Sequence, residues 1–79
     1  MGMPRHLRLS KVEADYLRYI YHTVIEEGKQ VTSGDLARQF KVRTPTAIDV
    51  LKRLESKGYV KKRRYSPVVL TRYGHRAAI

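Results

Sequence analysis

The chain has 79 residues, enough for one small domain, and Leu, Ile, Val and Phe make up about a quarter of it, more than disordered chains carry. It has no cysteine, which excludes disulfides and thiolate metal sites. No apolar run approaches the roughly 20 residues that cross a bilayer, and no signal peptide is evident, so we expect a cytoplasmic protein without a membrane segment.

The formal net charge is +10, and one half of the chain carries almost all of it. Residues 1–40 hold six Lys/Arg and five Asp/Glu, whereas residues 41–79 hold eleven Lys/Arg and two Asp/Glu. A positive field on one side attracts polyanions, of which nucleic acid is the most common. The alternative is a basic surface that only keeps the protein soluble.

The N-terminal part predicts a basic arm over residues 1–9, followed by a folded domain over residues 10–79. Ser10 followed by Glu13 matches a capping box, so a helix is expected to begin there. Gly28 is its expected left-handed cap. The expected buried face has apolar side chains at steps of three and four, namely Val12, Tyr16, Tyr19, Ile20 and Val24.

The next segments predict a short strand and a second helix. Gln30–Val31 is the expected extended piece, and Thr32 with Asp35 is a second capping box. The apolar stripe of this helix is Leu36, Ala37 and Phe40. Residues 41–43 form the turn that follows, with Val42 expected to fill part of the core.

A third helix is expected over about residues 44–57. Thr44 is its expected cap and Pro45 its first helical residue, where the missing N–H costs nothing. Gly58 is expected to close it. Its apolar face has the i, i+3, i+4, i+7 spacing and consists of Ala47, Val50, Leu51 and Leu54.

The last segments predict a hairpin and a short helix. The expected strands are Tyr59–Lys62 and Val68–Leu70, with Pro67 in the loop or at a strand start because it cannot donate in a ladder. Thr71 is the expected cap of the final helix. The resulting order α-β-α-α-β-β-α, mostly α with a small β-wing, is that of a winged helix-turn-helix.

The start of the third helix carries the candidate base contacts, because a helix in the major groove reads bases with its N-terminal turns. These candidates are Arg43, Thr44, Thr46 and either Ala47 or Asp49. Arg43 would fork onto guanine, and a threonine methyl would touch thymine. The alternative for Thr46 and Asp49 is a further capping box. Lys52 and Arg53 are candidate phosphate contacts, the alternative being a solvated helix flank.

The expected wing, residues 61–67, carries four consecutive cations and an aromatic residue, namely Lys61, Lys62, Arg63, Arg64 and Tyr65. After a recognition helix, such a wing is expected to follow the DNA backbone or insert an arginine into the minor groove.

Other kinds of site are weakly supported. Six tyrosines permit base stacking on RNA, but Tyr16, Tyr19 and Tyr21 fall outside the basic half, which favours core, rim or dimer-seam positions. His22 and Glu26, four residues apart, make half of a metal site without a third ligand nearby. No nucleophile–base pair, phosphate-binding glycine loop or carboxylate dyad is present. We therefore expect a protein that is not an enzyme, with no metal, other cofactor or small-molecule substrate.

Four segments together resemble a known family: LSKVEADYLRYIYH, VTSGDLARQFKV, TAIDVLKRLESKGYV and VVLTRYG. They look like the N-terminal DNA-binding domain of iron- and manganese-dependent repressors of the diphtheria-toxin-repressor type, over roughly residues 9–75. The resemblance implies a transcriptional repressor whose DNA contacts include Thr44, Pro45 and Thr46. The family's usual wing glycine is Pro67 here, so the wing geometry is expected to differ.

The same resemblance implies metal ligands near Asp15 and at Arg18, where a cation opposes a divalent metal. The remaining ligands and the dimerisation domain would lie beyond residue 79. The chain is then either a relative without metal control or an excised domain, and we expect a stand-alone, metal-independent DNA binder.

Three functions remain open from the sequence. The first expectation is a double-stranded DNA-binding transcriptional regulator, associated with the nucleoid. The alternatives are a non-specific architectural DNA- or RNA-binding protein and a winged helix that binds an acidic protein partner. Because one module covers few base pairs, a homodimer is also expected, with the tyrosines of the first helix and residues 77–79 as its candidate seam.

Overall fold

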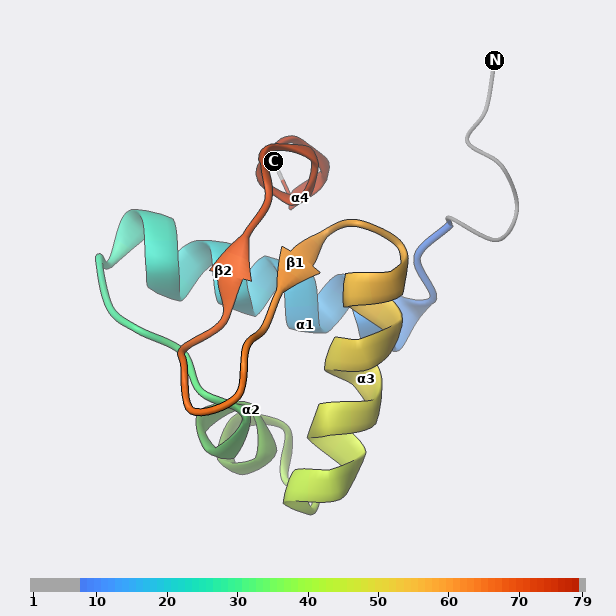
Figure 1. Ribbon diagram of the computed structural model, residues 1–79, viewed down its shortest axis with the longest axis vertical. Coiled ribbons are helices and arrows are strands. Elements are labelled where there is room, and N and C mark those ends of the chain that lie inside the picture. The colour runs from blue at the N-terminus through green and yellow to red at the C-terminus, as the bar shows by residue number, and fades with distance from the viewer. Residues whose placement is uncertain (1–7, 79) are drawn as a thin grey trace.

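The computed structural model describes residues 8–78 and confirms a winged helix-turn-helix that is mostly α with a two-stranded wing (Figure 1). Most of the predicted N-terminal arm, including Pro4, Arg5 and His6, lies outside the described residues. The elements are α1 (Lys11–Tyr21), the π-helix η2 (His22–Glu26), α2 (Ser33–Phe40), α3 (Thr44–Ser56), β1 (Val60–Lys61), β2 (Val69–Leu70) and α4 (Arg72–Ala78).

Both predicted capping boxes are confirmed. The Ser10 N–H donates to Glu13 Oε1 at 2.8 Å, and the Glu13 N–H donates back to Ser10 Oγ at 3.1 Å. The Thr32 N–H donates to Asp35 Oδ2 at 3.0 Å, and the Asp35 N–H donates back to Thr32 Oγ1 at 3.1 Å. Each box satisfies backbone donors that an isolated helix start leaves free, and so fixes where α1 and α2 begin.

The end of the first helix differs from the prediction, because residues His22–Glu26 form a π-turn. A π-turn places one additional residue in the turn, which rotates the following side chains relative to a 3.6-residue period. Within this turn Thr23 is buried and Val24 is only half-buried. At the other end, Val12 is 50% exposed whereas Glu13 is 2% exposed, so the predicted burial of Val12 is wrong.

The start of α3 lies one residue earlier than predicted. Arg43, not Thr44, is the cap residue, since its carbonyl accepts from the N–H groups of Thr46 at 3.0 Å and Ala47 at 3.2 Å. Pro45 is thus the second helical residue, where its missing N–H still costs no intrahelical bond. Because Thr46 and Asp49 lie inside α3, the alternative of a capping box between them is wrong.

The wing pairs β1 with β2 antiparallel, in the register Val60↔Leu70 and Lys61↔Val69. Within residues 8–78, the predicted strand at residues 30–31 is not formed; a hydrogen bond from the Val68 N–H to the Val31 carbonyl at 2.8 Å joins this segment to the wing. Pro67 precedes Val68 and has no N–H to extend the pairing. The first β in the predicted order is therefore replaced by this backbone contact.

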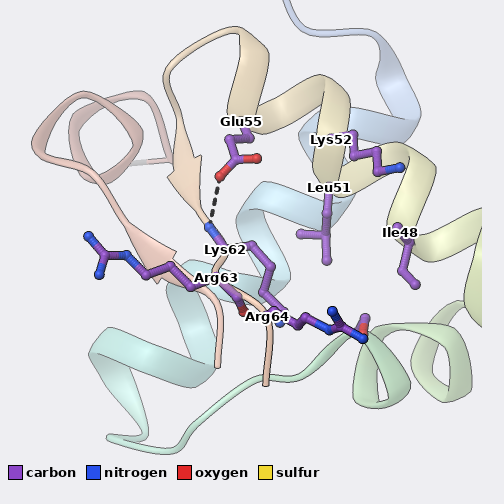
Figure 2. A pocket seen from close by; sticks show the side chains of 8 residues that line it. Ile48, Leu51, Lys52, Glu55, Lys62, Arg63 and Arg64 are labelled. Carbon is purple, nitrogen blue, oxygen red and sulfur yellow. Dashed lines mark hydrogen bonds between the residues drawn. The ribbon is translucent and has the colours of Figure 1, made fainter. Parts of the chain in front are cut away.

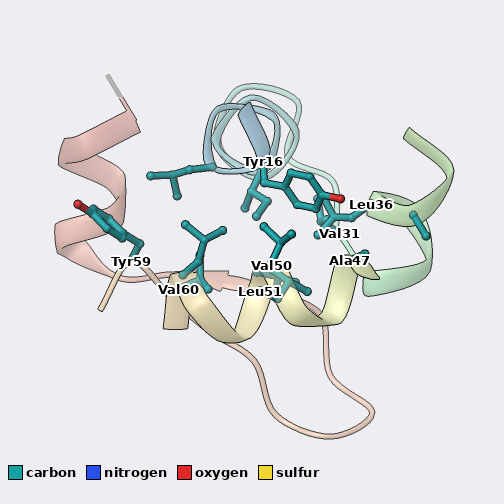
Figure 3. Close-up of a cluster of buried hydrophobic side chains, with 13 residues drawn as sticks. Tyr16, Val31, Leu36, Ala47, Val50, Leu51, Tyr59 and Val60 are labelled. Carbon is teal, nitrogen blue, oxygen red and sulfur yellow. The ribbon is translucent and has the colours of Figure 1, made fainter. Parts of the chain in front are cut away.

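The tyrosines of α1 belong to the core and its rim. Tyr16 stacks on Phe40 with ring centroids 4.0 Å apart, and Tyr19 meets Phe40 edge-on at 5.9 Å. Tyr21 meets His75 of α4 edge-on at 5.0 Å. Figure 3 shows that the core is formed where α1, α2, α3 and the wing meet. Its labelled side chains are Tyr16, Val31, Leu36, Ala47, Val50, Leu51, Tyr59 and Val60.

Candidate nucleic-acid interface

The outer face of α3 is exposed along its whole length. Arg43 lies just before the helix with extended backbone, and Pro45 and Asp49 lie opposite the buried stripe. The exposed residues predicted to contact DNA here are Arg43, Thr44, Pro45, Thr46, Asp49, Lys52 and Arg53. Ala47 is wrong as a base-contact candidate: it is 0% exposed because it shares the stripe that packs into the core.

The two predicted phosphate contacts lie on different flanks of α3. Lys52 lines a hollow between α3 and the wing. Arg53 lines a hollow on the other side, which includes Val12 of α1, and its Nε is 3.5 Å from Glu13 Oε2. Arg53 is thus partly oriented by a buried carboxylate, whereas Lys52 has no carboxylate within 4 Å among the described residues.

The far end of α3 is attached to α1 by a contact that sequence reasoning missed. Lys57 Nζ lies 2.5 Å from Glu13 Oε1 and donates to the Arg8 carbonyl at 2.8 Å. Burial alone would raise the pKa of Glu13, but the hydrogen bond and charge of Lys57 and the Ser10 N–H together hold that pKa below its ordinary value. Glu13 therefore remains charged and fixes α3 relative to α1.

Lys62, one of the wing residues predicted to contact DNA, instead holds the wing against α3. The backbone N–H of Lys62 donates to Glu55 Oε2 at 3.0 Å, as the dashed line in Figure 2 shows. Lys62 Nζ donates to the Arg63 carbonyl at 2.7 Å, and Lys62 is only half-exposed. Glu55, which the sequence did not single out, thus sets the distance between wing and helix.

The first strand of the wing and its loop present the remaining predicted residues to solvent. Lys61, Arg63, Arg64 and Tyr65 are exposed, Tyr65 by 89%. Tyr65 has left-handed backbone with φ of 62°, and the Arg64 guanidinium lies 5.0 Å from its ring centroid. A residue with a side chain is strained in that region by about 1 kcal/mol. The tip therefore displays an aromatic ring and adjacent cations.

Comparison with known proteins identifies the family of this chain. The sequence profile described as "Iron dependent repressor, N-terminal DNA binding domain" matches residues 8–68. The chain belongs to this family. The matched residues run from the start of α1 through α3 and the whole wing loop, so they include every residue of the exposed surface described above. The matched profile describes a DNA-binding domain, and this family member has a winged-helix fold.

Structural comparison supports the same fold. A mutant of MepR from a multidrug-resistant S. aureus clinical isolate superposes with a TM-score of 0.76 at 23% sequence identity. The superposition covers 99% of this chain and 58% of that chain, so this family member spans little more than half the length of that structure. A search of curated protein sequences gives no match. Among residues 8–78, no helix is both long and apolar enough to span a membrane.

The residues of this family member do not fit an iron site within the part of the chain that the structure describes. Asp15 is half-buried and Arg18, one turn further along α1, is an exposed cation. His22 Nδ1 lies 2.9 Å from Glu26 Oε1, a hydrogen bond that raises the pKa of His22. Across residues 8–78, no three His, Cys, Asp or Glu side chains are grouped to hold a metal ion.

Proposed function

We propose that this domain binds double-stranded DNA sequence-specifically as a transcriptional regulator, with α3 in the major groove and the wing on the backbone or in the minor groove. The observation that carries the proposal is the division of α3 into two faces. One face is packed from Ala47 to Leu54, and the other is exposed from Pro45 to Arg53. An α-helix fits the major groove only where such an outer face is free.

In this proposal, residues at the first turns of α3 contact the bases. Arg43 precedes the helix, is exposed and can reach guanine with its guanidinium, while Thr44 and Thr46 offer methyl and hydroxyl groups. Asp49 lies one turn further on and can accept from the amino group of cytosine. A carboxylate in a cationic surface repels phosphate, so Asp49 favours a specific base pattern over general adhesion.

In this proposal, residues on the two sides of α3 and on the wing contact the phosphates. Lys52 and Arg53 lie on either side of α3, and Lys61, Arg63 and Arg64 extend from the wing, with Tyr65 at its tip. The first turn of α3 has no side-chain cap, and because Pro45 lacks an N–H and the Thr46 N–H donates to the Arg43 carbonyl, the Thr44 N–H is the group left for a phosphate next to these cations. Lys62 contributes charge, but its ammonium is held on the wing backbone.

A salt titration tests duplex binding. Fluorescence anisotropy with a labelled duplex should give a log–log slope of about −4.5, because roughly five phosphate contacts contribute about 0.9 each. Single-stranded RNA of equal length should bind more weakly. Two results would favour the protein-interaction alternative: an affinity for duplex DNA that does not depend on salt, or capture of a protein partner that persists after nuclease treatment while no duplex binds.

We also propose that two copies act together on DNA in the nucleoid, because one module covers few base pairs. The rings of Tyr16, Tyr19 and Tyr21 already contact side chains of their own chain, so they provide little of a seam. Analytical ultracentrifugation at micromolar concentration should show a dimer with DNA; a strict monomer with and without DNA contradicts this proposal.

A further inference from the structure

A hollow of about 330 Å³, which we call the wing groove, separates α3 from the wing. Ile48 and Leu51 of α3 line it with apolar carbon, while Lys52, Arg63 and Arg64 line it with cations (Figure 2). The volume lies at the lower end of the range for small-molecule sites, which is about 300–1,000 Å³. Such a volume suits a small molecule better than a folded partner.

Two of the cations are available to a ligand. Neither Lys52 nor Arg64 has a carboxylate within 4 Å among the described residues. Figure 2 shows Arg64 reaching from the wing toward the side of the groove where Ile48 lies, while Arg63 is directed the other way. The groove's carboxylate, Glu55, already accepts the Lys62 N–H at 3.0 Å.

This arrangement combines an apolar wall with a positive rim. We propose that the wing groove binds a small amphipathic anion, an aromatic or branched body carrying one carboxylate. The body would pack on Ile48 and Leu51, and the carboxylate would lie between Lys52 and Arg64. Burial of the apolar body adds affinity that inorganic anions lack, and the carboxylate adds selectivity over neutral analogues.

Such a ligand would oppose DNA binding, and this part of the inference rests on the proposed function. Lys52 and Arg64 are also proposed phosphate contacts, so a carboxylate between them neutralises charge that DNA requires. The ligand's body would also occupy the space between α3 and the wing. Ligand and DNA therefore compete, and each lowers the apparent affinity of the other.

The probe is 2-naphthoate, with 2-naphthamide as its uncharged control, titrated into the ¹⁵N-labelled protein and followed by NMR. We expect a dissociation constant on the order of a millimolar for so small a ligand. Shifts should centre on Ile48, Leu51 and Arg64. Arg64→Ala should weaken binding by about tenfold, the loss of one charge-assisted contact. Arg18→Ala, an exposed cation outside the groove, should not.

A second variant tests the apolar part of the groove without changing its charge. Ile48→Trp fills the groove at its apolar wall and keeps every cation, so it should abolish naphthoate binding. Its melting temperature shows whether the variant folds. Against a labelled duplex, naphthoate should displace the unaltered protein, and sodium acetate at equal ionic strength should not. Displacement by naphthoate but not by acetate supports the regulatory part of the inference.

Three outcomes overturn the inference. If naphthamide binds as tightly as naphthoate, the cations do not contribute to binding. If the NMR chemical-shift changes are spread over all basic residues, no specific site exists in the wing groove. Duplex binding without any naphthoate binding removes the groove ligand and leaves the proposed function intact. If naphthoate binds but no duplex does, the ligand site stands, whereas the proposed function and the competition both fail.

Discussion

Glu13 and Lys57 join the first turn of α1 to the residue that follows α3, with Glu13 Oε1 2.5 Å from Lys57 Nζ. Glu13 is 2% exposed, so a charge in the core is neutralised by one at its edge. The same carboxylate caps α1 through Ser10 and lies 3.5 Å from the Arg53 Nε on α3. One side chain thus sets both the start of α1 and the orientation of α3.

Glu13→Gln should lower the free energy of unfolding by about 2 kcal/mol, because it removes a charged hydrogen-bond partner and leaves Lys57 without its counter-charge. Urea denaturation should show a lower midpoint with an unchanged m-value. The control Glu27→Gln, at an exposed position 3.9 Å from His22, should change the free energy by less than about 0.5 kcal/mol. Equal effects would contradict the anchoring role of Glu13.

Acid should destabilise the domain through the same group. The folded pKa of Glu13 is lowered from its ordinary value of 4.5, so its contribution is present above that pH. The contribution is lost as pH falls through the folded pKa. Asp35, whose pKa is lowered mainly by the Thr32 N–H, acts in the same direction below 3.8. Thermal melts from pH 6 to pH 2 should fall less steeply in Glu13→Gln, and parallel curves would count against this assignment.

Two glycines offer a matched pair for testing how α4 packs. A Cβ at Gly74 would lie 1.9 Å from the Tyr59 carbonyl oxygen, so Gly74→Ala should displace α4 and cost several kcal/mol, about 3 or more. A Cβ at Gly34 in α2 would meet nothing closer than 3.7 Å, so Gly34→Ala should stabilise the domain by about 0.5–1 kcal/mol. Thermal denaturation measures both, and a stable Gly74→Ala variant would refute the close approach of α4 to the Tyr59 backbone.

Arg63→Ala should weaken binding to every duplex alike, since an exposed wing cation that contacts phosphate carries no sequence information. The log–log salt slope should become shallower by about 0.9. Arg18→Ala, an exposed cation of α1, is the control and should leave the slope unchanged. A loss confined to one duplex sequence would show that Arg63 reads bases.

Arg43→Ala should instead relax sequence preference. A bidentate arginine–guanine contact contributes about 1–3 kcal/mol of discrimination, so the affinity ratio between a preferred duplex and its single-base variant should shrink by about tenfold or more. Competition binding with the two duplexes measures this ratio. If Arg43→Ala weakens both duplexes equally, Arg43 is a phosphate contact.

Much of the fold could be predicted because local chemistry determines it. The side chains of Ser10 and Thr32 each accept from the backbone N–H three residues on, and each residue's own N–H donates to the carboxylate at that position. Gly58 adopts φ of 83°, as expected of a helix end. The stripe from Ala47 to Leu54 gave the buried face of α3, and with it the exposed face. These features depend on residues within about one or two turns of each other.

What could not be predicted depends on how the elements pack against one another and on one irregular turn. Lys57 meets Glu13 across 44 positions, and Glu55 meets the wing only because α3 and β1 pack together. The π-turn over residues His22–Glu26 replaces the regular end of the first helix, and the spacing of the apolar residues does not predict it. The wing groove requires α3 and the hairpin in place before Ile48 and Arg64 face a common hollow.

Selection from a pool of random duplexes tests sequence-specific DNA binding most directly. After several rounds with the unaltered domain, we expect an enriched motif, repeated in two half-sites if the domain acts as a dimer. Selection with Arg43→Ala should yield a weaker motif from the same pool. Retention of duplexes without any enriched motif would contradict the account and favour a non-specific architectural protein.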